Sequence, residues 1–409
     1  MLNWAKQFDT FCFLDNHQYN IAPHTEECLL AAGVKRTITA TAGTALAQLD
    51  AFIQEKKSWL FGHLGYDLKN EIEQVTSSHA DPIGFADLFF FEPEIVIRFS
   101  QNQLQIEAQD PESVFHEIEQ QSSAPANARP LQSIQGRMTR EEYIAVISRL
   151  RQHILRGDCY EINYCQEFFS AGTPIDPVAV YHRLCAQSPN PFSALYRVKD
   201  QWLLCASPER FLKKSGSTLL SQPIKGTSRR YPTDAQQDLS SLRHLEQSAK
   251  DRSENVMVVD LVRNDLARIC AEGSVKVDEL FGLYSFPQVH QMISTVSGQV
   301  KTELPFSAVI RAMFPMGSMT GAPKKRVMEL IEQYECSRRG IFSGAVGYIS
   351  PEGDFDFNVV IRSIMYNQAT AYTSFQAGSG ITFYSDPVQE WEECQLKAAV
   401  LREVLQAKQ

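Results

Sequence analysis

The chain has 409 residues, enough for one large domain or for two or three ordinary ones. Hydrophobic residues make up 44% and charged residues 21%, a globular composition that needs no disulfide or metal to build a core. With 39 basic and 48 acidic residues the formal net charge is −9, which argues against general affinity for nucleic-acid backbone.

Membrane and secreted classes are also disfavoured. No apolar run reaches the roughly 18 residues of a membrane-spanning helix, and the segment Met1–Asp15 lacks the pattern of a signal peptide. The 9 cysteines include no C-x-x-C pair and no spacing suited to zinc. They are typical of reduced thiols, so we expect a cytoplasmic protein whose partners are neither nucleic acid nor membrane.

The predicted elements of the first third are short. A helix is expected over Thr41–Glu55, and strand-like runs follow at Leu88–Phe91 and Glu94–Phe99. The segment Gln120–Pro130 is small, polar and contains two prolines. This composition predicts a linker or a long surface loop.

After this segment the hydrophobic periodicity becomes clearer. Thr139 and Glu142 form a capping-box pattern, and the helical apolar stripe that follows ends at Gly157. Tyr160–Phe168 alternates with period two, as a strand does. Because strand candidates come in neighbouring pairs, we expect a largely antiparallel α+β fold. The further candidates are strands at Trp202–Ala206, Thr218–Ser221, Gly344–Ile349, Asn358–Met365 and Ala371–Gln376, and helices at about Asp238–Arg268, Pro323–Tyr334 and Pro387–Ala407.

A predicted hairpin brings one lysine and one glutamate together. If its loop is Ser215–Ser217, Glu209 faces Pro223, and Lys225 lies diagonal to Glu209 at roughly 7–8 Å. A loop one residue shorter or longer would reverse this parity. The two side chains are then placed to act as nucleophile and acid on a small substrate. The alternative is a surface ion pair without function.

Four carboxylates occur as two pairs on predicted helices. Asp251 and Glu254 are three residues apart, and Glu390 and Glu393 repeat that spacing near the C-terminus. Such pairs usually mark a solvated face. Brought together, they would instead offer the oxygen ligands that Mg²⁺ prefers. Lys397, one turn after Glu393, is either a balancing charge or a surface lysine.

Two glycine-containing segments and two cationic residues complete the candidates. Gly317–Pro323 leads into a helix N-terminus, which attracts anions, and Gln376–Ile381 follows a strand and offers backbone N–H groups to a carboxylate. Glycines mostly mark turns, so each signal is weak alone. Arg362 could grip a carboxylate with two nitrogens. His290 is either a packed histidine or a group that touches a leaving hydroxyl.

These motifs together resemble the chorismate-utilising enzymes, a family that includes anthranilate and isochorismate synthases. The resemblance runs from about Gly136 to Leu405, and it is fainter before residue 130, where Phe13–Asp15 carries it. The strings that match, in order, are Gly157–Asn163, Ser207–Phe211, Ser253–Leu266, Val289–Met292, Gly317–Lys324 and Gln376–Ile381.

The resemblance implies a fold and a site. The fold would be two antiparallel β-sheets packed as a sandwich with helices outside, to which residues 1–130 contribute, with residues 136–409 as the chorismate-binding catalytic domain. Mg²⁺ would be held by Glu254 and Glu393, with Asp251 and Glu390 in support. The remaining implied roles are catalysis by Lys225, Glu209 and His290, and substrate binding by Arg362, Tyr348, Thr320, Gly378, Ser379 and Gly380.

Within the family, the string Pro223–Thr227 favours amination of chorismate at C4 over other outcomes. The branch that performs this amination has a nucleophilic lysine where Lys225 stands, whereas anthranilate synthases typically have alanine. A desolvated lysine near a metal can have a lowered pKa and attack as the free amine. Ammonia would come from a separate glutamine amidotransferase subunit, because the chain contains no cysteine nucleophile elbow.

Three alternatives and two open points remain. The alternatives are anthranilate synthase component I, isochorismate synthase, and a scaffold that only activates a glutaminase. Lys225 argues against the first, and Glu161, which stands where isomerising relatives have lysine, argues against the second. Amidating relatives usually have glutamine there, so the role of Glu161 is open. Asn190–Ser193 only partly matches a tryptophan site, so tryptophan binding is open too.

Overall fold

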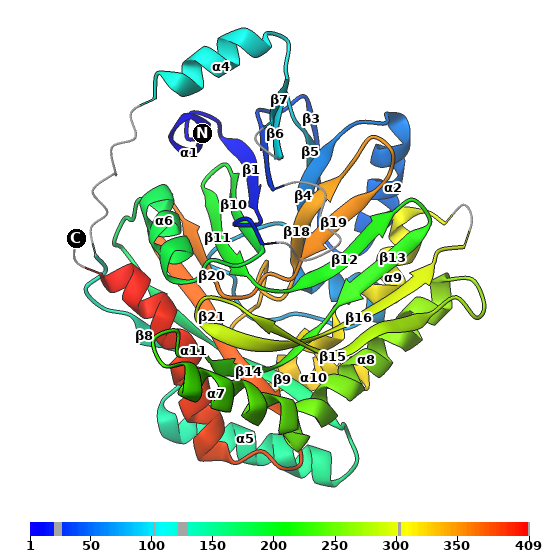
Figure 1. The fold of residues 1–409 in the computed structure, drawn as a ribbon, viewed down its shortest axis with the longest axis vertical. Helices are drawn as coiled ribbons and strands as arrows, with labels where there is room; N and C mark the ends of the chain where they lie inside the picture. Colours follow the sequence, from blue (N-terminus) through cyan, green and yellow to red (C-terminus); the bar gives the residue numbers. More distant parts are fainter. Residues whose placement is uncertain (20–26, 101–102, 122–129, 302–303, 408–409) are drawn as a thin grey trace.

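The chain folds as two antiparallel β-sheets packed face to face, with helices on the outer sides (Figure 1). This confirms the predicted α+β sandwich. The computed structural model describes residues 1–19, 27–100, 103–121, 130–301 and 304–407. Most of the predicted linker Gln120–Pro130 lies outside the described residues.

The first sheet has 11 strands among the described residues. It contains strands from the first hundred residues and strands from the C-terminal part of the chain. Its order is β17 (Gly321–Ala322), β9 (Glu161–Ser170), β21 (Tyr372–Ile381), β20 (Ser363–Asn367), β11 (Gln201–Ser207), β10 (Phe192–Val198), β1 (Thr10–Asp15), β2 (Cys28–Ala32), β6 (Ile95–Ser100) and β7 (Gln103–Glu107), with β8 (Gln135–Gly136) beside β9.

The second sheet has 10 strands in the described part of the chain. Strands of the first hundred residues form one of its ends. Its order is β14 (Ile224–Arg229), β16 (Val289–Gln299), β13 (Thr218–Gln222), β12 (Arg210–Ser215), β19 (Phe355–Asn358), β18 (Ala345–Ile349), β4 (Leu60–Leu64), β5 (Leu88–Glu92) and β3 (Arg36–Ala40), with β15 (Lys276–Ser285) beside β16.

Helices cover the outer face of each sheet. α5, α6 and α11 pack on the first sheet, and α2, α7 and α8 pack on the second. The helices are α1 (Leu2–Ala5), α2 (Ala45–Glu55), α3 (Lys69–Glu73), α4 (Pro111–Glu119), α5 (Arg140–Leu155), α6 (Pro177–Gln187), α7 (Ala235–Gln247), α8 (Ala249–Ile269), α9 (Phe306–Met313), α10 (Lys324–Tyr334) and α11 (Pro387–Gln406), with 3₁₀ turns η1 (Tyr66–Leu68) and η2 (Gly317–Met319).

Alternation along the strands separates two hydrophobic layers. On β1, Phe11 and Phe13 join the layer between the first sheet and its helices, whereas Cys12 lies in the core between the sheets. On β9, Ile162 and Tyr164 face the helices in the same way. The period of two thus decides which side chains the outer helices cover.

Two predicted elements are each broken in the structure. The helix predicted over Asp238–Arg268 ends and restarts at Ser248, whose hydroxyl accepts from the Asp251 N–H at 3.2 Å and caps α8. The strand predicted over Asn358–Met365 is two strands, β19 in the second sheet and β20 in the first. Arg362 lies at this crossover with a left-handed φ of 50°.

The predicted hairpin loop is one residue too long, yet the predicted parity holds. Ser215 pairs directly with Thr218, so β12 and β13 are joined by two residues. A β-bulge then shifts the register, and Arg210 pairs with Gln222. Because a bulge adds one residue to one strand, it restores the face that the shorter loop would have reversed.

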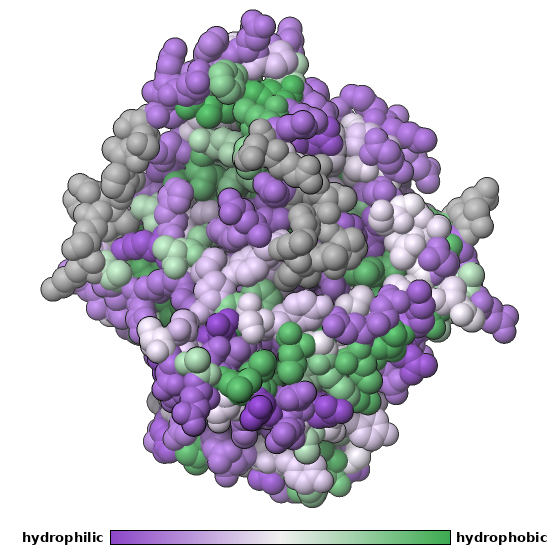
Figure 2. Space-filling model, viewed as in Figure 1, coloured by the Kyte–Doolittle hydropathy of each residue, from purple (hydrophilic) through white to green (hydrophobic). Residues whose placement is uncertain are grey.

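The surface combines hydrophilic residues with a hydrophobic region. Figure 2 shows hydrophobic residues where Figure 1 places α7, α8 and β15, and these elements carry the exposed Leu239, Val256 and Leu280. Among the described residues no helix combines the length and the hydrophobicity needed to cross a membrane.

Candidate active site

An ion pair between the two sheets marks the candidate site. Lys225 on β14 donates from Nζ to Oε1 of Glu161 on β9 at 2.6 Å. The side chains are 10% and 1% exposed, respectively. Gly380 lies directly against both, since a Cβ there would come 2.7 Å from Glu161 Oε1 and 3.0 Å from Lys225 Nζ. The lysine is therefore enclosed by β9, β14 and β21.

The protein groups around Lys225 raise its pKa, and the lowering expected for a lysine near a bound metal stays a prediction. Burial alone would lower the pKa, but the nearby carboxylates of Glu161 and Glu254 outweigh burial and raise it. Lys225 is thus a protonated ammonium here. An attack by its nitrogen requires that the proton first move to a neighbour, and Glu161 is in contact with it.

Glu209 is a buried carboxyl group suited to donate a proton. Its side chain accepts a hydrogen bond from the Ser318 hydroxyl at 2.6 Å. Burial raises its pKa to about 7, although the Ser318 hydrogen bond and the charges of Lys225 and Arg362 oppose the increase. Ser318 was not among the predicted site residues, although it lies within the predicted segment Gly317–Pro323.

Arg362 places a cation beside Glu209. Burial lowers the pKa of its guanidinium to about 10, and the charge of Glu209 acts against this change. Across the described residues, no acceptor is hydrogen-bonded to the guanidinium. A left-handed backbone at a non-glycine residue is held by the surrounding structure and often occurs at functional sites. The group fits a carboxylate ligand.

After Phe375, β21 pairs with a described strand on one side only, that of β9. Gly380 is paired with Asn163, whose N–H donates to Thr320 O at 2.7 Å rather than to β21. Gly378 has the same parity, and its carbonyl accepts from Lys397 at 3.1 Å. In an antiparallel ladder both polar groups of such residues point away from the partner strand. The Gly378 and Gly380 amides are therefore directed away from β9, as expected for anion binding.

The four predicted carboxylates surround one lysine. Lys250 Nζ lies 3.9 Å from Glu254 Oε1 and 3.7 Å from Glu390 Oε1. Its pKa is raised: burial opposes the change, and the carboxylates of Glu390, Glu254, Glu393 and Asp251 outweigh it. The helices α8 and α11 thus bring both carboxylate pairs together.

The donor set fits a hard cation such as Mg²⁺. Glu254 Oε1 is buried without a hydrogen bond from any described residue, and burial raises the Glu254 pKa to about 7. Lys397, 2.7 Å from Glu393, lowers the pKa of that carboxyl although burial opposes the shift. Within the described ranges no three ligating side chains converge on one point, so a metal would have to draw them together.

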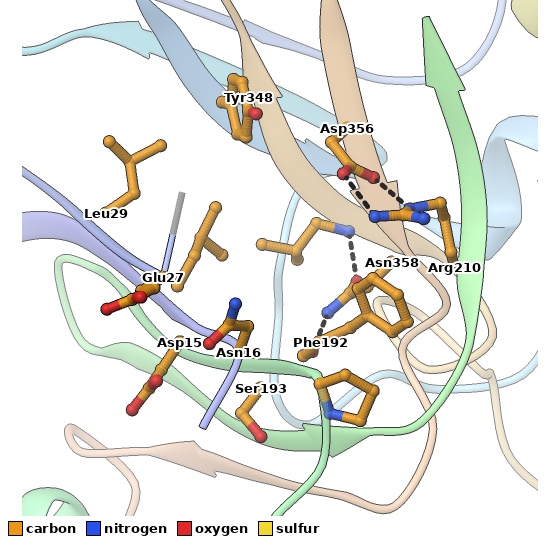
Figure 3. A pocket seen from close by; sticks show the side chains of 13 residues that line it. Asp15, Asn16, Glu27, Leu29, Phe192, Ser193, Arg210, Tyr348, Asp356 and Asn358 are labelled. Atoms are coloured by element: carbon orange, nitrogen blue, oxygen red, sulfur yellow. Dashed lines mark hydrogen bonds and ion pairs between the residues drawn. The ribbon is translucent and has the colours of Figure 1, made fainter. Parts of the chain in front are cut away.

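Tyr348 and His290 lie away from these groups. Tyr348 lines a pocket between the sheets together with Asp15, Phe192 and Asn358 (Figure 3). The His290 ring contacts the Ser285 hydroxyl at 2.8 Å and lies 3.2 Å from an Asp238 oxygen on α7. His290 therefore has its described hydrogen-bond and ion-pair partners on β15 and α7, and Tyr348 lies in the lining of this pocket.

Thr320 and Ser379 act within the framework of the site. The Thr320 hydroxyl donates to Met316 O at 3.1 Å, and its carbonyl holds β9. The Ser379 hydroxyl donates to Glu390 Oε2 at 2.5 Å. Ser379 therefore fixes one oxygen of Glu390 and leaves the other to Lys250.

Buried polar networks that the sequence did not indicate support these residues. Arg339 donates to Glu335 at 2.6 Å, to Met319 O at 2.8 Å and to Asn163 O at 2.8 Å, which joins η2 to β9. Asn255 accepts from the Ser294 hydroxyl at 2.6 Å and donates to Lys225 O at 3.4 Å. These contacts fix the backbone beside Lys225 and Ser318.

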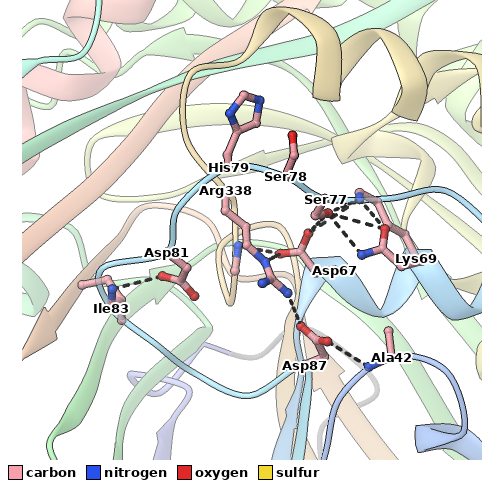
Figure 4. Close-up of polar contacts among 12 residues, drawn as sticks. Ala42, Asp67, Lys69, Ser77, Ser78, His79, Asp81, Ile83, Asp87 and Arg338 are labelled. Atoms are coloured by element: carbon pink, nitrogen blue, oxygen red, sulfur yellow. Dashed lines mark hydrogen bonds and ion pairs between the residues drawn. The ribbon is translucent and has the colours of Figure 1, made fainter.

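The residue next to Arg339 anchors the same segment to the first third of the chain. Arg338 lies 2.8 Å from Asp67 and 2.6 Å from Asp87 (Figure 4). Asp67 also accepts from Ser77 and lies 3.6 Å from the buried Lys69. Residues far apart in sequence are thereby tied together behind the site.

Gly380→Ala is expected to disrupt the ion pair. The added Cβ would lie 2.7 Å from Glu161 Oε1, a distance that real Cβ atoms do not show, and at a tight 3.0 Å from Lys225 Nζ, so the ends of these side chains must shift. We expect activity to fall by on the order of 10²-fold, since displacements of about 1 Å cost that much. Gly136→Ala, whose Cβ would meet its nearest atoms at 3.4 Å, is the matched control for steady-state kinetics. Equal activities of the two variants would contradict the expected close contact.

Comparison with known proteins identifies the family of the chain. The family described as chorismate binding enzyme matches residues 6–403. Aminodeoxychorismate synthase component 1 of Escherichia coli (strain K12) is 40% identical over 259 residues, which are 63% of this chain and 56% of that protein. Its namesake in Bacillus subtilis (strain 168) is 31% identical over 362 residues, covering 84% of this chain and 76% of the relative.

A solved structure shows the same fold. The crystal structure of anthranilate synthase component I from Streptococcus pneumoniae TIGR4 matches with a TM-score of 0.82 at 24% identity, over 94% of each chain. At this identity the likeness concerns the fold alone. The family match, which spans nearly the whole chain, shows that the protein belongs to the chorismate binding enzymes.

Proposed function

We propose that the protein aminates chorismate at C4 to give 4-amino-4-deoxychorismate, the reaction of p-aminobenzoate synthesis. The observation that carries this proposal is the buried contact of Lys225 with Glu161, in range of the charges of Glu209 and Glu254. A lysine at this position supplies a nucleophile from the enzyme. An isochorismate synthase, in which water attacks the ring, does not need one. The relatives named aminodeoxychorismate synthase component 1 support the same reaction.

Substrate binding is assigned to the cationic and amide groups of the site. Chorismate has two carboxylates, and a protein of net charge −9 must bind them through local positive groups. Arg362 and the amides of Gly378 and Gly380 are proposed to bind one carboxylate. The ring carboxylate of chorismate then faces the four acidic residues of α8 and α11. Because all these groups are negatively charged, a cation is needed between the substrate and the protein.

Mg²⁺ is the cation proposed for this position, held by Glu254 and Glu393 with Asp251 and Glu390 in support. When bound, it would neutralise the ring carboxylate and stabilise charge as the double bonds shift. Glu254 Oε1 supports this assignment, because it is buried and accepts no hydrogen bond from the described residues. All four donors are carboxylates, the ligand type that Mg²⁺ prefers.

The first half of the reaction forms a bond to the enzyme. Lys225 passes one proton to Glu161, and its neutral nitrogen attacks C2 of the ring. Both ring double bonds shift, the C4–oxygen bond breaks, and the oxygen leaves as water with a proton from Glu209. The proton transfer is to a group in direct contact, since Lys225 Nζ lies 2.6 Å from Glu161 Oε1, and burial of the lysine lowers part of its cost. This gives Glu161 a catalytic role.

The second half releases the enzyme. Ammonia adds at C4, both double bonds shift back, and the C2–nitrogen bond breaks with return of the lysine. The net change replaces the C4 hydroxyl by an amino group and leaves the enolpyruvyl group intact. Glu209, now ionised, can take the extra proton from the added ammonia. General-acid help of this kind is typically worth about 10²–10⁴-fold.

The ammonia is proposed to come from a separate glutamine amidotransferase subunit. The name component 1 of the relatives implies that those proteins work with a second component. For this chain, ammonium salts should replace the partner in an assay. Chorismate amination should therefore be measurable with the isolated chain.

One assay tests the function. The protein is incubated with chorismate, Mg²⁺ and ammonium, and the products are identified by liquid chromatography while pyruvate is measured enzymatically. We expect 4-amino-4-deoxychorismate without pyruvate. Anthranilate with pyruvate, isochorismate, or unchanged chorismate would each contradict the proposal in favour of one of the three alternatives.

A further inference from the structure

Lys250 lies where a cation is needed between two helices. It belongs to α8, and its ammonium reaches Glu254 on the same helix and Glu390 on α11. The other Glu390 oxygen is held by Ser379, and Glu254 Oε1 has no hydrogen bond from the described residues. Lys250 therefore faces the oxygens that the rest of the structure leaves unpaired.

The position of Lys250 is unfavourable for the helix that carries it. It is the second residue of α8, after the Ser248 cap. The N-terminal end of a helix disfavours positive charge, and a lysine four residues before a glutamate is the weaker order of such a pair. Helix stability thus gives no reason for a lysine at this place, whereas the contact with two helices does.

We propose that Lys250 is an internal counter-ion that occupies the metal position in the metal-free protein and competes with Mg²⁺. This inference rests on the metal site proposed above, but not on the fate of chorismate. Together with Asp251, Glu254, Glu390 and Glu393, Lys250 and Lys397 leave the cluster with a net charge of −2 when all are ionised. A bound Mg²⁺ displaces the Lys250 ammonium toward solvent, where its side chain is already 48% exposed.

The proposal predicts that removing the lysine strengthens metal binding. In Lys250→Met the side chain keeps its length, and Mg²⁺ no longer competes with an ammonium about 4 Å from two carboxylates. We expect the Mg²⁺ dissociation constant to fall by roughly tenfold or more. The measurement is isothermal titration calorimetry of EDTA-stripped full-length protein with MgCl₂, without chorismate, supported by the increase in melting temperature that MgCl₂ causes.

Two further variants make the test specific. Lys250→Arg keeps the charge and should bind Mg²⁺ as the wild type does. Arg263→Gln removes a cation from the exposed face of the same helix, 2.8 Å from Asp260, and should leave Mg²⁺ affinity unchanged. If Lys250→Met does not fold, Lys250→Gln replaces it.

The outcomes separate this inference from the metal site itself. Equal or weaker Mg²⁺ binding by the uncharged variant, with normal binding by the wild type, would overturn the role of Lys250 alone. Absence of Mg²⁺ binding in both proteins would overturn the metal site and this inference together. Tighter binding in Lys250→Met, but not in Lys250→Arg or Arg263→Gln, supports it.

Discussion

We expect Lys225→Ala to lower the rate of chorismate amination by on the order of 10³-fold or more, because it removes the nucleophile itself. The substitution also leaves Glu161 as a buried carboxylate without its ion-pair partner, which destabilises a protein strongly. Loss of activity alone would therefore not separate chemistry from folding. The rate of amination and the melting temperature have to be measured together.

A double variant makes that separation. Lys225→Met with Glu161→Gln removes both charges of the pair, so no buried charge is left unpaired. We expect it to melt close to the wild type and to remain inactive. Lys214→Ala is the control. It removes the 3.2 Å ion pair between Asp354 and Lys214, which lies on β12 of the same sheet as Lys225, and it should keep full activity. Amination by the double variant at more than a tenth of the wild-type rate would rule out covalent catalysis.

Glu209→Gln is expected to lower kcat by about 10²–10⁴-fold with little change in chorismate affinity, since the amide keeps the shape but cannot donate the proton. The wild-type pH profile follows from the same group. An acid must be protonated to act, and the Glu209 pKa is raised to about 7, so kcat should fall as the pH rises above about 7. Saturating Mg²⁺ keeps Glu254 ionised during this measurement.

Ser318→Ala tests whether the descending limb belongs to Glu209. The Ser318 hydrogen bond lowers the Glu209 pKa, so its removal should move the fall in kcat to higher pH. A purely structural effect of the serine would change kcat at every pH alike. An unshifted limb in Ser318→Ala, or a Glu209→Gln variant within tenfold of wild-type kcat, would contradict the assignment of Glu209 as the acid.

Local chemistry explains which parts of the fold could be predicted. The capping box at Thr139 and the Asp386–Pro387 start define α5 and α11 because these groups act within a few residues of one another. The break at Ser248 falls in the polar stretch Glu246–Asn255, where Ala249 is the one apolar residue, so apolar periodicity gives no signal for or against a helix boundary there. The run Asn358–Met365 is rich in β-branched and other apolar residues on both sides of Arg362 and Ser363, and this pattern does not show where a chain passes from one sheet to another.

The sequence indicated individual candidate residues of the site, but it did not indicate which of them contact one another. Carboxylate spacing and the hairpin indicated Glu254, Glu393, Glu209 and Lys225, because residue type and parity are local properties. That Glu161 partners Lys225 depends on two sheets meeting, which no local pattern records. The same limit applies to Tyr348 and His290, whose predicted roles stay predictions.

The central claim, a covalent bond between chorismate and Lys225, has a direct measurement. The protein is mixed with chorismate and Mg²⁺ without ammonia, quenched in acid, and analysed by intact and peptide mass spectrometry. We predict an increase equal to chorismate less one water on the peptide that contains Lys225, and its loss when ammonium is added before the quench. Steady amination upon addition of ammonium, with no adduct on that peptide in its absence, would contradict the account.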